Sequence, residues 1–112
     1  MLNFCSLYSG SSGNSLFVET ENTKLLIDAG VSSKKIENAL DGLNINPSLL
    51  DGILITHEHS DHVQGLGTFA KKFNVPVFVN SKTLDNMPKQ KDKIPQNIIC
   101  LLYTSPSPPR PY

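Results

Sequence analysis

The three histidines of the chain, His57, His59 and His62, all lie within six residues, and Asp61 lies among them. Imidazole nitrogens are common ligands of Zn²⁺ and of Fe or Mn ions, and an aspartate adds a hard oxygen ligand. On extended backbone, residues spaced by two point to the same side, which would align His57, His59 and Asp61. His62 lies where the next helix should begin. The spacing predicts four ligands that converge on a small volume and can serve two adjacent metal ions, His57 and His59 on one and Asp61 and His62 on the other.

A second interpretation of this cluster is a solvated loop that binds nothing. We favour the metal site, because three histidines and an aspartate directly after a buried strand are difficult to explain as ordinary surface. The stretch is not the H-E-x-x-H motif of zinc proteases, because position 61 holds aspartate instead of histidine. Glu58 points the opposite way on extended backbone, so we expect it to face solvent or to lie behind the ligands.

The segments around the cluster alternate between strand and helix patterns. The run 51–56 predicts a short strand buried on both faces, and 63–73 predicts a helix that ends at Asn74. Another helix is predicted after the serine pair at 32–33, where apolar residues recur at helical spacing up to Leu43. The remaining predicted elements are strands at 2–8, 15–20, 24–29, 75–80 and 97–103, and a short helix from Ser81 to Met87. This alternation predicts an α/β or mixed α+β fold in one small domain.

Composition and charge exclude few functions. Ten basic and ten acidic side chains give a formal net charge of zero, so composition alone indicates neither nucleic acid nor an anionic membrane as a partner. No apolar run approaches the length of a membrane span, and the N-terminus lacks the features of a signal peptide. Cys5 and Cys100 form no CxxC pair, which favours reduced cysteines in buried strands. We therefore expect a cytoplasmic protein without a membrane partner, whose oligomeric state the sequence does not indicate.

Residues 101–112 differ from the rest of the chain. The last seven residues contain four of the eight prolines and the only arginine. A proline-dense segment cannot continue a sheet or a helix. One interpretation is a disordered tail, or an SH3-type ligand with Pro-x-x-Pro spacing. The other, which we favour, is translated sequence that is not native, because the amino-acid bias changes as abruptly as the structural pattern.

Three stretches carry a resemblance to a known family. The sequence THEHSDHVQGL, at 56–66, resembles the metal-binding motif of the metallo-β-lactamase superfamily, and LLIDAG, at 25–30, resembles the family's upstream strand. With SLYSGSSGNS, at 6–15, the chain looks like the bacterial WalJ/YycJ-type branch, a set of hydrolases that act as DNA exonucleases. The resemblance runs from about Leu2 to Val79, and less clearly to about Cys100.

This resemblance implies a fold, a domain arrangement and a metal centre. The family fold is an αββα sandwich of two similar halves, and residues 1–100 would form its N-terminal half. His57 and His59 would bind the first metal ion, and Asp61 and His62 the second. The resemblance implies two divalent ions, with Zn²⁺ as the default and Mn²⁺ or Fe as alternatives that use the same ligands.

It also implies roles for residues outside the histidine motif. Asp28 would orient a ligand imidazole through a hydrogen bond, whereas without the resemblance a turn residue at a strand end explains it nearly as well. A loop would border the active site as a substrate loop, although its sequence alone favours an ordinary turn. The loop residues are Ser11, Ser12, Gly13 and Asn14.

The implied reaction is metal-assisted hydrolysis, in which two ions about 3.5–4 Å apart hold a water and lower its pKa towards about 7. We assign the catalytic role to Asp61 and His62, and expect DNA phosphodiesters as substrate of the complete protein. A thioester or lactam hydrolase of the same superfamily, and a non-catalytic metal-binding half-domain, are the alternatives.

Part of the expected coordination shell is missing from the chain. A catalytic zinc usually has three protein ligands and a water, whereas four ligands shared by two ions leave two each. The family takes its further ligands from later in the sequence, but no histidine follows His62, and the only later carboxylates are Asp85 and Asp92 in lysine-rich segments. A half-sandwich would also leave an apolar sheet face open. We therefore expect the complete protein to be an enzyme, and this chain to bind metal weakly and to hydrolyse little.

Overall fold

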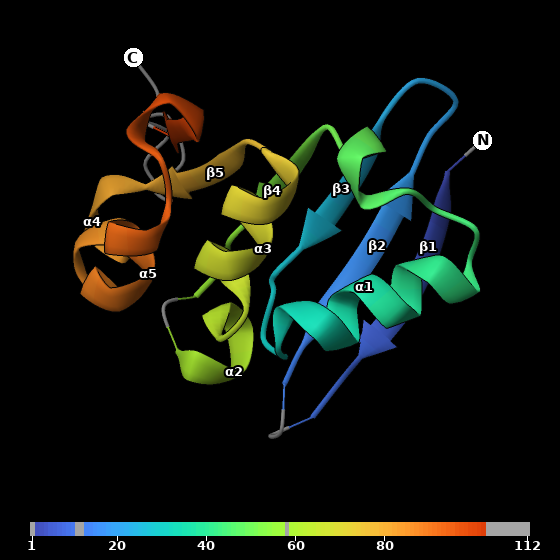
Figure 1. The fold of residues 1–112 in the computed structure, drawn as a ribbon, viewed down its shortest axis with the longest axis horizontal. Helices are drawn as coiled ribbons and strands as arrows, with labels where there is room; N and C mark the ends of the chain where they lie inside the picture. Colours follow the sequence, from blue (N-terminus) through green and yellow to red (C-terminus); the bar gives the residue numbers. More distant parts are fainter. Residues whose placement is uncertain (1, 11–12, 58, 103–112) are drawn as a thin grey trace, which may run out of the picture.

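A mixed six-stranded sheet forms the centre of the molecule. The computed structural model describes residues 2–10, 13–57 and 59–102. The strands follow one another across the sheet in chain order; β1 to β3 are antiparallel and β3 to β6 are parallel. Their bounds are β1 Asn3–Tyr8, β2 Ser15–Glu19, β3 Lys24–Ile27, β4 Gly52–Leu54, β5 Val77–Asn80 and β6 Ile99–Leu102. The mixed α/β fold predicted from the sequence is confirmed (Figure 1).

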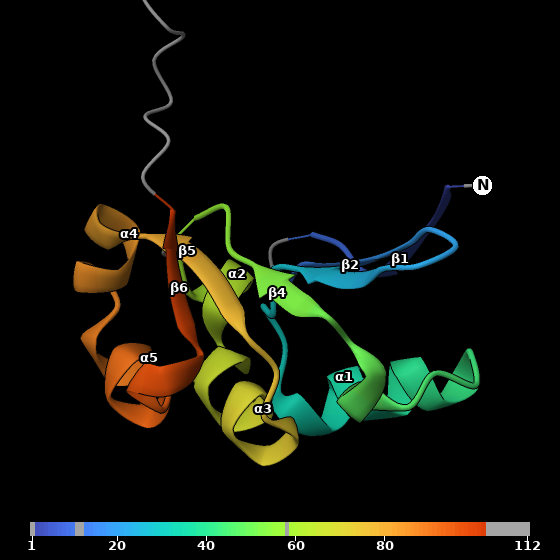
Figure 2. The ribbon, with the colours of Figure 1, turned by 90° about the horizontal axis from the view of Figure 1, so that it is seen from above.

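The longer helices connect the parallel strands and cover one face of the sheet. Figure 2 shows α1, α3 and α5 on the same side of the strands. The helices are α1 Ser33–Gly42, α2 Ser60–Val63, α3 Leu66–Phe73, α4 Ser81–Asp85 and α5 Pro88–Lys93, with 3₁₀ turns at Pro47–Leu49 and Gln96–Ile98. The Ser32 side chain accepts a hydrogen bond from the Lys35 N–H and begins α1, as predicted. Leu43 caps the end of α1 and is 40% exposed, so the buried stripe of that helix ends at Leu40.

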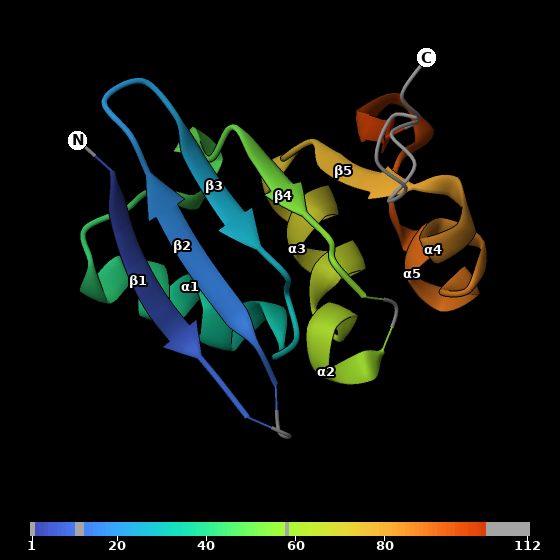
Figure 3. The same cartoon turned by 180° about the vertical axis from the view of Figure 1, so that it is seen from behind.

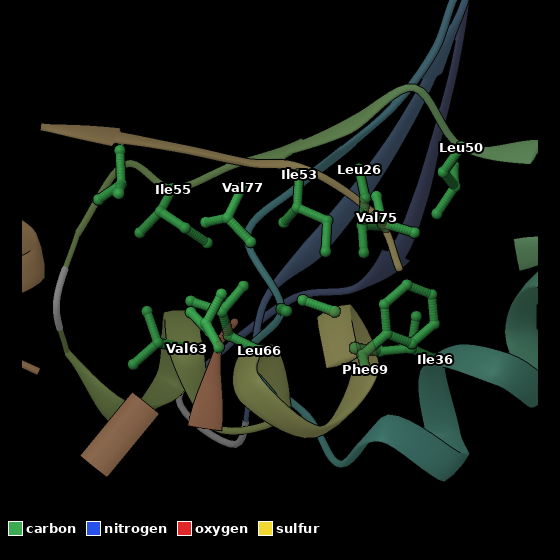
Figure 4. Close-up of a cluster of buried hydrophobic side chains, with 14 of the residues drawn as sticks. Leu26, Ile36, Leu50, Ile53, Ile55, Val63, Leu66, Phe69, Val75 and Val77 are labelled. Carbon is green, nitrogen blue, oxygen red and sulfur yellow. The ribbon is translucent and has the colours of Figure 1, made fainter. Parts of the chain in front are cut away.

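The hydrophobic core fills the space between this helical layer and the sheet. Ile53, Val77 and Leu26 point from the strands toward Leu66 and Phe69 of α3 (Figure 4), and each of these five side chains is fully buried. Burying one such side chain contributes roughly 1.5–3 kcal/mol relative to leaving it exposed. This packing fixes the ends of β3 and β4 against α3, where the predicted metal ligands lie.

The opposite face of the sheet is apolar and less buried. Along β2 to β5, residues alternate between fully buried positions over the helices and half-buried positions on this second face. A Cβ on Gly52 would lie 2.3 Å from the Phe78 ring, so the ring covers that glycine, while Phe4 on β1 is 63% exposed. Leu54 is also only half-buried, so the predicted burial of β4 on both faces is wrong for this chain. Among the described residues, no helix lies over the face of β1 to β4 opposite α1 and α3 (Figure 2).

The predicted helix over 63–73 is interrupted. The structure has two helices, α2 and α3, separated by a turn at Gln64–Gly65. The Gly65 N–H donates to the Ala29 carbonyl oxygen, 2.8 Å away, instead of to a helix carbonyl. Asn74 ends α3 with a left-handed backbone (φ 55°), as predicted.

The later elements differ slightly from expectation. Asn80, not Ser81, caps α4, because its side chain accepts from the Thr83 N–H at 2.7 Å. Strand β6 continues through Leu102, two residues into the segment assigned to the tail. The rest of that proline-rich segment, 103–112, lies outside the described residues.

Cys5 and Cys100 are free thiols on β1 and β6, the two opposite edges of the sheet, and both are half-buried. In the described part of the chain, no helix combines the length and apolar character that crossing a membrane requires.

Candidate metal centre

The candidate site lies where β3 and β4 end. These neighbouring strands are parallel, so their carboxyl ends meet at the same edge of the sheet. Asp28 directly follows β3, and Thr56 and His57 follow β4 after one buried residue, Ile55. Helix α2, which carries His62, lies beside this edge (Figure 3). The topology therefore brings Asp28 together with side chains about thirty residues later.

Asp28 is the centre of a hydrogen-bond network. Its side chain is buried, and its backbone has a positive φ of 64°, a conformation that aspartate adopts more readily than most residues. The Thr56 N–H donates to Oδ1 at 2.8 Å, and the Thr56 hydroxyl donates to Oδ2 at 2.6 Å. His62 Nδ1 lies 2.8 Å from the same Oδ2. This one carboxylate therefore ties the end of β4 to the helix that carries His62.

The network assigns the protons of two imidazole rings. A carboxylate can only accept hydrogen bonds, so His62 donates through Nδ1–H, and in the neutral ring the lone pair is then on Nε2. The Thr56 hydroxyl has a single proton, and Asp28 accepts it. The Thr56 oxygen, 2.9 Å from His57 Nδ1, must then accept the proton of that nitrogen. Both rings consequently present Nε2 as the metal-binding nitrogen.

The donor set fits a divalent metal ion. The rings of His57 and His62 have centroids 4.7 Å apart, and Asp28, His57 and His62 each offer a ligand atom within 4.8 Å of the others. Both oxygens of Asp28 already accept hydrogen bonds from the protein. We therefore interpret Asp28 as a residue that orients His62 directly and His57 through Thr56, an arrangement typical of metal-binding histidines, and not as a ligand itself.

The remaining motif residues lie at the start of α2. His59 is exposed, with its ring centroid 6.2 Å from that of His57, and its carbonyl oxygen accepts from the His62 N–H at 2.8 Å. Because α2 begins at Ser60, Asp61 is helical, and the alternation expected of extended backbone does not reach it. The Asp61 side chain and Glu58 lie outside the described part of the structure.

The glycine- and serine-rich loop packs beside the Asp28 segment. Ser11 and Ser12 lie outside the described residues. Gly13 has a φ of 151°, and a Cβ there would lie 2.4 Å from a methyl carbon of Val31, so glycine permits this close approach. The Asn14 side chain forms hydrogen bonds with the backbone N–H and the backbone carbonyl of Gly10. The backbone carbonyl of Asn14 accepts from the N–H of Gly30, two residues after Asp28. The loop thus borders the segment that carries Asp28.

The sequence reasoning missed two contributors to the site. Thr56 immediately precedes the first histidine, and a hydroxyl next to an imidazole is a signal that could have suggested its role. The backbone of Ala29 gave no such signal: its N–H donates to the His62 carbonyl, and its carbonyl accepts from Gly65, both at 2.8 Å.

A family model and curated relatives match this chain. The model described as the metallo-β-lactamase superfamily matches residues 8–100. The chain is 52% identical over 85 residues to the exodeoxyribonuclease WalJ of Streptococcus pneumoniae, a match that covers 76% of this chain and 32% of that protein. It is 47% identical over 94 residues to the exodeoxyribonuclease YycJ of Bacillus anthracis, covering 84% of this chain and 36% of the relative. The chain therefore spans about a third of the length of these relatives.

The fold also matches a solved structure. A metallo-β-lactamase of Cronobacter sakazakii superposes with a TM-score of 0.63 at 20% sequence identity, over 71% of this chain and 33% of that one. At this identity the likeness concerns the fold alone.

Proposed function

Since the chain belongs to the metallo-β-lactamase superfamily, we propose that it forms the N-terminal part of a metal-dependent DNA exonuclease. The observation that carries this proposal is the network in which Asp28 and Thr56 bind Nδ1 of His62 and of His57, two rings whose centroids lie 4.7 Å apart, and leave Nε2 of each ring for a metal ion. The similarity to the two exodeoxyribonucleases supports DNA as the substrate. The proposed ligands of two divalent ions, Zn²⁺ by default, are His57, His59, Asp61 and His62.

The protein residues have separable tasks in this proposal. Metal ions would supply a water that is acidic enough to yield hydroxide near neutral pH, and positive charge for the leaving oxygen. Asp28 holds the His62 ring through Nδ1, and Thr56 holds the His57 ring in the same way. The buried position of Asp28 keeps this support rigid, so the ligands are oriented before any ion binds.

We propose that this chain alone has little or no activity. It supplies only part of the length of its relatives, and no helix of the described residues covers the second face of its sheet. Residues 1–100 would be the structured part of the domain, with 101–112 as a tail outside it. The complete protein would work in the cytoplasm, where its DNA substrate is found.

The test compares metal binding with hydrolysis. Zn²⁺ is titrated into the purified chain and into a His57→Ala variant, with Lys34→Ala on the exposed side of α1 as a control. We expect weak Zn²⁺ binding that the first variant loses and the control keeps, and no release of nucleotides from a labelled DNA strand. Robust EDTA-sensitive nuclease activity from this chain would overturn the proposal that it is inactive.

The substrate is tested on the complete coding sequence, read through and beyond codon 100. We expect further histidines and aspartates there, and EDTA-sensitive cleavage of DNA from its ends. Turnover of a model thioester but not of DNA would replace the substrate class. Failure of the chain to bind Zn²⁺ at millimolar concentration would contradict the metal centre itself.

A further inference from the structure

We propose that Gln90, on α5, is a positioning residue for the turn that follows His62. Its side chain caps α3 from a neighbouring helix and holds the Gln64–Gly65 turn in place. The link to metal binding rests on the metal centre proposed above, whereas the effect on the turn can be measured without metal.

One side of this turn is held by the loop after Asp28. Ala29 binds both the His62 carbonyl and the Gly65 N–H, each at 2.8 Å. A Cβ on Gly65 would lie 2.1 Å from the Val31 carbonyl oxygen, so the turn lies directly against this loop. These bonds bring the His62 backbone close to Asp28. Among the bonds of the described residues, those of Ala29 reach neither Gln64 nor the Gly67 N–H in the first turn of α3.

The start of α3 lacks a cap from its own sequence. The N-terminal N–H groups of a helix have no partner within the helix, and a Ser, Thr, Asp or Asn at the N-cap usually accepts from one of them. The N-cap of α3 is Gly65, which makes no side-chain bond. Gln90 Oε1 instead accepts from the Gly67 N–H, at 2.8 Å in a partly buried position. Gln90, on α5, therefore accepts the hydrogen bond that the N-cap side chain of α3 would normally accept.

The same side chain also contacts the turn. Gln90 Nε2 donates to the Gln64 carbonyl oxygen at 3.4 Å, a longer bond than the one to Gly67. One amide thus joins the residue two positions after His62 to the first turn of α3. The turn between α2 and α3 is then restrained from both sides, by Ala29 and by Gln90.

Local packing explains how a residue so distant in sequence reaches this position. A Cβ on Gly67 would lie 2.5 Å from the Lys93 Cβ and 3.0 Å from Gln90 Oε1, so only glycine lets α5 approach this closely. Met87, which precedes α5, is 4% exposed and fixes the start of that helix in the core. The glycine at 67 and the glutamine at 90 are therefore complementary.

The experiment uses three variants of the chain. Gln90→Leu keeps the size of the side chain but removes both hydrogen bonds, and Gln90→Glu keeps an acceptor for the Gly67 N–H. Gln96→Leu is the matched control, because Gln96 is exposed and none of its hydrogen bonds among the described residues reaches the turn. Ile98→Val, a small change at a buried position, shows what a loss of global stability alone does.

The first measurement is amide hydrogen exchange without metal, at Gly65 and Gly67 in the turn and at Ile53 in the sheet. We expect Gln90→Leu to speed exchange at the two glycines by about tenfold relative to Ile53, and Gln90→Glu to restore most of the protection at Gly67. The second measurement is the Zn²⁺ dissociation constant. We expect Gln90→Leu to raise it about three- to tenfold, less than loss of a direct partner of a ligand.

The outcomes separate the two proposals. If exchange at Gly65 and Gly67 changes no more in Gln90→Leu than in Ile98→Val, Gln90 is only a packing residue and the inference is wrong. If the turn loosens but the Zn²⁺ dissociation constant is unchanged, Gln90 does not position the metal site. If the unmodified chain binds no Zn²⁺ while the turn still loosens, the metal centre fails and the capping role of Gln90 stands.

Discussion

Replacing Thr56 by valine tests the hydrogen-bond network most directly. Valine keeps the β-branched shape and the backbone N–H that donates to Asp28, and removes only the hydroxyl. The lost bond, 2.6 Å long, ends on a charged acceptor, and such bonds contribute roughly 1.5–3 kcal/mol to stability when buried. Thr56 is largely exposed, so we expect the free energy of unfolding to fall by about 1–1.5 kcal/mol, at or just below the bottom of that range.

The effect on metal binding should be larger than the effect on stability. Without the hydroxyl, His57 Nδ1 loses the acceptor that fixes its proton and the orientation of its ring. Loss of such a partner typically weakens metal binding by roughly 10- to 100-fold. The Zn²⁺ dissociation constant of Thr56→Val should therefore rise by about tenfold or more, while Thr56→Ser, which keeps the hydroxyl, should stay within about threefold of the unmodified chain.

The assay combines competition with a chromophoric chelator for Zn²⁺ and urea unfolding of the same samples. Thr68→Val is the control, because Thr68 lies exposed on α3 and has no side-chain bond within the described residues. The reasoning about the ring protons would be refuted if Thr56→Val bound Zn²⁺ as tightly as the unmodified chain. Equal weakening by Thr68→Val would show that the effect is not specific to the site.

Three further predictions follow from described contacts. Asp28→Ala removes the acceptor of three hydrogen bonds at a position with positive φ, so the free energy of unfolding in urea should fall by about 3 kcal/mol. Asp28→Asn should lower it less, because asparagine tolerates that φ. Gly65→Ala should lower the free energy of unfolding by about 2–3 kcal/mol, because the new Cβ would meet the Val31 carbonyl oxygen. The control Gly42→Ala, at the end of α1, meets nothing within 4 Å and should raise it by about 0.5–1 kcal/mol. Equal effects of the two substitutions would contradict the packing of the turn. Zn²⁺ at about ten times its dissociation constant should stabilise the chain by about 1.4 kcal/mol in thermal unfolding, an effect that EDTA reverses and that His57→Ala lacks.

The sequence predicted the fold well because local patterns agreed with the final contacts. The runs that became β2 to β5 are short and mostly apolar, and they also pack together in the core. The caps at Ser32 and Asn74 depend only on neighbouring backbone, so they too were predictable. The motif pointed to metal chemistry by residue type, and the comparisons support the family.

The interruption after His62 could not be read from the motif itself. A helical pattern runs through Gln64 and Gly65, but the Gly65 N–H bonds to Ala29, which lies thirty-six residues earlier. Such bonds depend on where β3 ends relative to β4, which only the folded sheet decides. For the same reason, the roles of Thr56 and Gln90 became visible only when segments distant in sequence were placed side by side.

The order of strands across the sheet has a consequence for synthesis of the protein on the ribosome. Because spatial order equals chain order, each strand of the nascent chain can add to an edge that has already formed. At roughly 5–20 residues per second, all six strands emerge within about 5 to 20 s. During that time the half-buried apolar face opposite α1 and α3 is open to solvent, and molecular chaperones bind such surfaces. The layout that lets this sheet assemble early thus also leaves an apolar face that needs protection from aggregation.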